Sequence, residues 1–141
     1  MNLPLTPLRF LERAKTFYGK KEGIICGAER FTYAAFFERC CRLAGALSAA
    51  GHRPGDRVAF LSYNCHRLLE GYYGVLLARG VLLPLNIRLS PAEIAFILRN
   101  AGVRIAFLDQ DFLPLVQAIQ THLPPGLRLF LLEHAESAPT G

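Results

Sequence analysis

Four short apolar runs recur from residue 58 onward, each beginning 23 or 24 residues after the one before it. They are continuous rather than alternating, which is typical of strands covered on both faces of a parallel sheet. The pattern predicts four mutually parallel strands near residues 58–62, 81–85, 104–108 and 128–132.

Helical periodicity fills the intervals between these runs and predicts helices over 66–78, 90–101 and 111–123. The first would pack through Leu69, Tyr72, Tyr73 and Leu76. The second opens on Ser90-Pro91-Ala92-Glu93, a capping box with proline at the first helical position, and ends at Gly102. Strand, helix and strand at this spacing form right-handed βαβ units. The predicted fold is therefore α/β, an open, mainly parallel sheet with helices on both faces.

A short helix and a β-hairpin are predicted before the sheet. The helix would begin at Pro7 with Thr6 as its cap, and the hairpin would join 23–26 to 31–33 across the tetrapeptide 27–30. An amphipathic helix follows, capped by Thr32 and stopped by Gly51. Its stripe of aromatic and apolar residues suits core packing better than a ligand groove.

Composition narrows the class of protein. The 141 residues are 52% apolar and 19% charged, which excludes intrinsic disorder. No apolar run reaches the ~18 residues of a membrane span, and no signal peptide is expected at the N-terminus. Lys and Arg number 11 against 6 Asp and Glu in residues 1–70, and 5 against 5 afterwards. This surplus is scattered, so we expect no nucleic-acid partner. A cytoplasmic location is predicted.

Candidate chemistry is sparse. Four cysteines lack zinc-type spacing and are expected to be buried free thiols, and Cys65-His66 lacks a third orienting group. His52, His122 and His134 are expected at the surface. Asp109 and Asp111 follow a strand, where Asp109 is expected to be solvated and Asp111 to cap the next helix, as Asn64 would cap its own. Dinucleotide and Walker-type phosphate motifs are absent. No catalytic or metal-binding residue is predicted, and no cofactor-binding residue can be named.

An ordered set of motifs nevertheless resembles the start of AMP-forming acyl-CoA synthetases, of the adenylate-forming ligase superfamily. The motifs are TPLRFLERA at 6–14, FTY at 31–33, RLAGAL at 42–47, GDRVA at 55–59, EGYYGV at 70–75, PLNIRLS at 84–90 and EIAFIL at 93–98. The run 84–98, with DQDF at 109–112, is most similar to enzymes that activate short- to medium-chain or aromatic acids. One departure is Ala78-Arg79-Gly80, where the family usually has Ala-Gly-Ala.

The resemblance implies an enzyme that makes an acyl-adenylate from a carboxylic acid and Mg-ATP, and then transfers the acyl group to coenzyme A. It also implies a phosphate loop ending Pro-Lys-Gly, a Tyr-Gly-x-Thr-Glu stretch, a ribose-binding Asp and a C-terminal lysine, none of which this sequence contains. ATP, Mg and CoA would therefore serve the full-length enzyme and not this chain. Residues 1–141 correspond to an incomplete N-terminal part of the adenylation domain, with 134–141 as a linker or tail.

Three hypotheses remain open on the sequence alone. The chain is an inactive N-terminal portion of an acyl-CoA synthetase, a stand-alone α/β binding module derived from that family, or an unrelated flavodoxin-like domain. The first implies the remainder of the parent enzyme as partner and predicts exposed apolar surface that promotes self-association. The acid substrate and the oligomeric state cannot be deduced from these residues.

Overall fold

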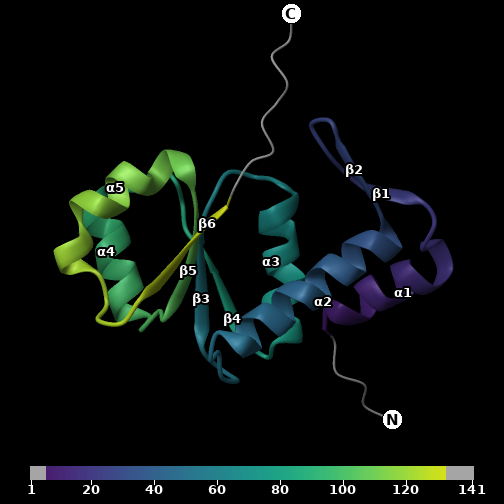
Figure 1. Cartoon of the computed structure of the whole chain (residues 1–141), viewed down its shortest axis with the longest axis horizontal. Coiled ribbons are helices and arrows are strands. Elements are labelled where there is room, and N and C mark those ends of the chain that lie inside the picture. The colour runs from purple at the N-terminus through teal and green to yellow at the C-terminus, as the bar shows by residue number, and fades with distance from the viewer. Residues whose placement is uncertain (1–5, 133–141) are drawn as a thin grey trace, which may run out of the picture. The chain divides into compact units, whose positions relative to one another are not determined.

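The computed structural model describes residues 6–132, which group into two compact units (Figure 1). Unit 1 contains the chain up to Gly55 together with Asn64–Leu82, and unit 2 contains Asp56–Tyr63 and the chain from Leu83 onward. The predicted tail 134–141 lies outside the described residues. The α/β fold with a parallel four-stranded sheet and a separate hairpin is confirmed.

Unit 1 holds three longer helices and the hairpin. They are α1 (Leu8–Tyr18), β1 (Glu22–Cys26), β2 (Glu29–Thr32), α2 (Tyr33–Ala49) and α3 (His66–Leu77). Thr32 caps α2 as predicted, since its Oγ1 accepts from Ala35 N at 3.2 Å. Gly51 follows the end of α2 with φ +79°, a conformation that glycine adopts without steric cost.

The N-terminal elements differ slightly from the prediction. Pro7 occupies the N-cap position rather than the first helical position, and Thr6 Oγ1 accepts from Leu8 N at 3.4 Å. The hairpin turn is Gly27-Ala28 alone, because Glu29 and Arg30 already belong to β2. Gly27 has φ +60°, which permits this tighter turn.

The predicted inward face of α3 is correct at Tyr73, which packs against the core of unit 1, and wrong at Leu69 and Tyr72. Leu69 and Tyr72 are 37% and 45% exposed, whereas the buried positions of α3 include Leu68, Gly74 and Val75. A Cβ placed on Gly74 would lie 2.7 Å from Leu43 Cδ2, so the missing side chain lets α3 approach α2 closely. Counting large apolar residues missed part of this face because glycine marks where it is tightest.

Arg79 follows α3 in a left-handed conformation, with φ +60°. The N–H groups of Arg79 and Gly80 donate to the carbonyl groups of Leu76 and Val75, and this closes the helix. Glycine is the usual residue at such a position after a helix. Arg79 is the one non-glycine residue with positive φ among residues 6–132.

Most of the parallel sheet lies in unit 2, and its strand order is β4-β3-β5-β6. The strands are β3 (Arg57–Leu61), β4 (Val81–Pro84), β5 (Ile105–Asp109) and β6 (Arg128–Leu132). The pairing of β5 with β3 and β6 places Phe60, Phe107 and Phe130 in register. Their rings stack with centroid separations of 4.7 and 5.4 Å. This aromatic ladder fixes the register on one face of the sheet.

Two helices lie on one side of this sheet, α4 (Pro91–Asn100) and α5 (Leu113–Ala118) (Figure 1). They enclose a core that includes Ala106, Leu108 and Ile94. The predicted capping box is present: Ser90 Oγ accepts from Glu93 N, and the Glu93 carboxylate accepts from Ser90 N at 2.8 Å. The hydrogen bonds from Ser90 lower the pKa of Glu93.

The outer strands contradict the expectation of coverage on both faces. β3 is buried over Val58–Leu61, but Leu129 and Leu131 of β6 are 41% and 47% exposed, and Val81 of β4 is 50% exposed. A continuous apolar run therefore does not distinguish central from edge strands.

The predicted helix over 111–123 is wrong in its extent. The chain forms a 3₁₀ turn at Gln110–Phe112, the short helix α5, and a second 3₁₀ turn at Gln120–His122. Pro114 lies in the first turn of α5, where the backbone N–H that proline lacks has no partner within the helix. This favours a helix that begins at Leu113 rather than at 111. Pro124 favours the extended conformation seen at Leu123, which ends the segment.

Candidate functional site

The carboxyl ends of β3 and β5 meet at Tyr63 and Asp109. Asp109 is fully buried, and its Oδ2 accepts from Tyr63 N at 2.8 Å. The expectation that Asp109 is solvated is therefore wrong, because strand pairing places it beside the end of β3. The carboxylate holds the loop that follows β3, at the edge where open parallel sheets bind ligands.

Tyr63 and Asp111 lie next to this buried carboxylate. Partial burial, followed by the charge of Asp111 and a hydrogen bond with it, raises the pKa of Tyr63. The Tyr63 ring packs against Phe112, with 5.1 Å between centroids. Asp111 does not cap α5, since it lies within the preceding 3₁₀ turn. The phenol at this edge is consequently a neutral hydrogen-bonding group.

Asn64 does not act as the predicted cap of α3. The N-cap of α3 is Cys65, which makes no side-chain capping hydrogen bond. The next strand end is ordered locally, since Asn86 Oδ1 accepts from Arg88 N at 3.0 Å. The polar side chains at these strand ends therefore hydrogen-bond backbone N–H groups of the loops, as Asp109 does with Tyr63 and Asn86 with Arg88.

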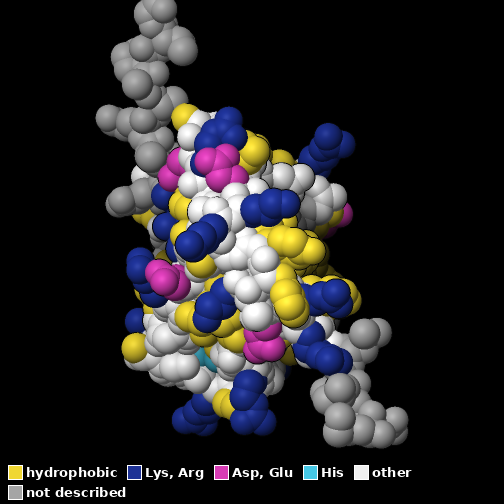
Figure 2. Space-filling model, turned by 90° about the vertical axis from the view of Figure 1, so that its right-hand side faces the viewer, with side chains coloured by type: hydrophobic (Ala, Val, Ile, Leu, Met, Phe, Trp, Pro, Cys, Tyr) yellow, Lys and Arg dark blue, Asp and Glu magenta, His cyan; other side chains and the backbone are white. Residues whose placement is uncertain are grey.

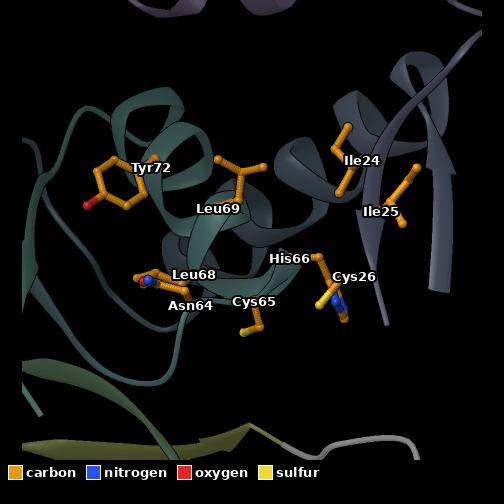
Figure 3. Close-up of a pocket in the computed structure, with 9 residues that line it drawn as sticks. All are labelled: Ile24, Ile25, Cys26, Asn64, Cys65, His66, Leu68, Leu69 and Tyr72. Atoms are coloured by element: carbon orange, nitrogen blue, oxygen red, sulfur yellow. The ribbon is translucent and has the colours of Figure 1, made fainter. Parts of the chain in front are cut away.

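A separate cavity of 340 Å³ opens in unit 1 beside β1 and the start of α3 (Figure 3). Its walls are mostly apolar, with two cysteines, one histidine and one asparagine among them. The lining residues are Ile24, Ile25, Cys26, Asn64, Cys65, His66, Leu68, Leu69 and Tyr72.

His66 is buried at the edge of this cavity. Its Nδ1 lies 3.2 Å from Glu29 Oε2, and its ring packs against Phe31 with 5.0 Å between centroids. Burial lowers the pKa of His66, although the carboxylates of Glu29 and Glu70 oppose this shift. Although Nδ1 lies close to Glu29, neither ring nitrogen makes a hydrogen bond of suitable geometry within the described chain. His66 therefore does not hydrogen-bond the adjacent Cys65 thiol, as activation of that thiol would require.

Residues of three elements meet beside His66 in an arrangement that sequence patterns did not reveal. Arg39 Nε donates to Glu70 Oε1 at 2.5 Å, and the Arg39 guanidinium lies 4.8 Å above the Phe31 ring. Glu70 is 8% exposed, so its charge is compensated inside unit 1. The 31-residue separation of Arg39 and Glu70 carries no local sequence signal. This pair ties α2 to α3.

The four cysteines, all among the described residues, form no disulfide and are not uniformly buried. Cys40 is buried, Cys41 is exposed, and Cys26 and Cys65 are intermediate. Burial and the nearby Glu70 raise the pKa of Cys40 to about 12, which makes its thiol unreactive. The expectation of burial therefore holds for Cys40 alone.

The histidines outside the cavity divide in the same way. Both ring nitrogens of His52 are buried without a hydrogen-bond partner in the described residues, and the ring lies against Gly80. The surface placement expected for His52 is thus wrong, whereas His122 is exposed as expected. His134 lies outside the described residues.

The profile of the AMP-binding enzyme family matches residues 10–138. This chain belongs to that family. The chain is 38% identical over 141 residues to a peroxisomal butyrate–CoA ligase of Arabidopsis thaliana, with 96% of the chain and 25% of that relative covered. It is also 41% identical over 136 residues to a long-chain-fatty-acid–CoA ligase of Thermus thermophilus, with 94% and 25% covered.

Solved structures agree with this family assignment. The N-terminal domain of FACL13 from Mycobacterium tuberculosis superposes with a TM-score of 0.82 at 28% identity, covering 89% of the present chain and 33% of the FACL13 chain. An anthranilate CoA ligase in complex with anthranoyl-AMP gives a TM-score of 0.87, and its 23% identity supports the fold alone, over 94% and 26% of the two chains. The chain spans about a quarter of the length of the curated relatives named above.

The residues present do not fit Mg-ATP. Within residues 6–132, no three His, Cys, Asp or Glu side chains gather closely enough to hold a metal ion. Asp109 is buried against the backbone of the Tyr63 loop, and the sequence contains no phosphate loop. The described residues therefore supply no contact on which a step of adenylation could rest.

Proposed function

We propose that this chain is the N-terminal portion of an acyl-CoA ligase that activates a carboxylic acid with ATP to acyl-AMP and transfers the acyl group to CoA. By itself the chain does not catalyse either step. The observation that carries the proposal is a match across nearly the whole chain to about a quarter of several CoA ligases. In this account the chain contributes scaffold, and the adenylating residues belong to the remainder of the enzyme.

The uncovered edge of unit 2 supports this proposal. β6 ends the sheet order, and Leu129 and Leu131 are exposed on it. Exposed apolar edge strands are usually covered or paired in stable proteins. The remainder of a ligase would supply such cover, whereas a stand-alone module would need to tolerate the exposure.

The substrate class is proposed as short- to medium-chain or aromatic acids. Relatives named as butyrate–CoA and benzoate–CoA ligases support this class, and a long-chain ligase lies at similar identity. The cytoplasmic location stays a prediction, since the two plant relatives are named as peroxisomal.

A chimera tests the proposal directly. The matching first quarter of the Thermus thermophilus ligase is replaced by this chain, and ATP-dependent acyl-CoA synthesis is measured. We expect a folded ligase with activity above that of the Thermus enzyme lacking its first quarter. A folded but inactive chimera would contradict the proposal, and so would a chimera that fails to fold while both parent chains fold.

A further inference from the structure

The surface of α1 combines large exposed rings with positive charge. Phe10 is 65% exposed and Phe17 is 70% exposed, and seven residues of helix bring the two side chains to the same face, about 10 Å apart. Arg13 lies between them, with its guanidinium 5.9 Å from the Phe17 ring centroid. We call Arg9, Phe10, Arg13 and Phe17 the α1 surface. Burying such rings from water is favourable, so their exposure calls for an explanation.

Charge on this part of the molecule has one predominant sign. Residues 6–21 contain five Lys or Arg and one Glu. Arg9, Arg13 and Lys20 are all exposed, and Lys21 lies 5.4 Å from the ring of Tyr18, itself 52% exposed. Figure 2 shows this side of the molecule, where dark blue Lys and Arg side chains surround yellow apolar ones and outnumber the magenta acidic ones.

We propose that the α1 surface docks on the surface of an anionic phospholipid bilayer. Basic side chains beside aromatic ones on an amphipathic helix are the combination that binds the headgroup region. Both rings are largely exposed and carry no hydrogen-bonding group, so they suit the apolar layer beneath basic-residue contacts with anionic headgroups. No described helix is long and apolar enough to cross a bilayer, and the proposed contact is peripheral.

Vesicle binding of the whole 141-residue chain tests this proposal. Sedimentation compares pure phosphatidylcholine vesicles with vesicles containing 30% phosphatidylglycerol, at about 20 and 500 mM NaCl. We expect at least tenfold tighter binding to the anionic vesicles at low salt, with loss of that preference at high salt. Because the chain contains no Trp, F17W provides a reporter whose emission should shift to the blue with anionic vesicles.

Variants of α1 and a control on α4 distinguish binding through the α1 surface from nonspecific adsorption to vesicles. The pair R9Q/R13Q should weaken binding about 25-fold, since each basic residue near the membrane contributes about fivefold. F10S/F17S should weaken it at least tenfold. The control F96S/R99Q removes an exposed Phe and an exposed Arg from α4 at the same i, i+3 spacing as Phe10 and Arg13, and should change binding less than twofold.

Several results would overturn the proposal. Among them are absence of binding to anionic vesicles, equal binding to neutral vesicles, an equal loss in F96S/R99Q, and preferential binding of an acidic amphipathic peptide that displaces the chain from vesicles. Light scattering without lipid tests whether a second copy of the chain binds the α1 surface. A dimer that becomes monomeric in F10S/F17S would assign this surface to self-association instead.

Discussion

At the scale of single residues, Arg79 holds a left-handed backbone conformation that glycine adopts at lower cost. Replacing it by glycine should raise the free energy of unfolding by about 1 kcal/mol. R79A removes the same charge but keeps the Cβ atom, so it should not give this gain. Urea denaturation of the three proteins measures the difference, and equal stability of R79G and R79A would show that the conformation is unstrained.

His66 should make stability depend on pH. Burial lowers its pKa in the folded chain, so the unfolded chain, with an ordinary value of about 6.5, binds the proton more tightly. The contribution of His66 to the free energy of unfolding is therefore fully present above pH ~6.5. It is lost as the pH falls through the lowered pKa of the folded chain. Thermal unfolding between pH 5 and 8 should show a shallower loss in H66Q than in the natural chain. Parallel curves would contradict this assignment.

At the scale of elements, two helical glycines provide a matched test of how α2 and α3 pack. A Cβ on Gly74 would lie 2.7 Å from Leu43 Cδ2, whereas a Cβ on Gly45 would meet no atom within 4 Å. G45A should stabilise the chain by about 1 kcal/mol through helix propensity. G74A should destabilise it despite the same gain, as chemical denaturation would show. A stabilising G74A would mean that α2 and α3 are not closely packed.

Local signals predicted those elements whose determinants are close in sequence. Thr32, Ser90 and Gly102 mark helix ends through their own backbone and side-chain chemistry, and the strand period gave the parallel sheet. Part of the buried face of α3 was missed because it is formed by Gly74 against Leu43. The extent of α5 was missed because apolar periodicity does not register Pro114, which lies in the first turn of the helix.

The candidate site was harder to predict than the fold. Tyr63 and Asp109 are 46 residues apart, and their pairing follows only from the register of β3 against β5. Arg39 and Glu70 similarly meet only when α2 packs on α3. The sequence does place Asp109 at the end of a predicted strand. In a parallel sheet that position lies beside the loop that follows a neighbouring strand, and this is the one signal that could have favoured a buried Asp109.

At the scale of the whole molecule, exposed apolar side chains on the edge strand β6 should cause self-association. L131K places a charge on this edge and should reduce the mass measured by light scattering at high micromolar concentration. Q117K adds the same charge at an exposed position of α5 and should leave the measured mass unchanged. A natural chain that is a single 15.7 kDa species would contradict this prediction and favour a stand-alone module.

The central claim is that the chain is an incomplete ligase without adenylating residues of its own. Pyrophosphate exchange by the purified chain, with ATP, Mg²⁺ and butyrate, octanoate or benzoate in turn, tests it most directly. We expect exchange at the level of the protein-free control with all three acids, because preorganised phosphate contacts are required and the sequence contains no phosphate loop. A signal that depends on the carboxylic acid and disappears with EDTA would contradict it.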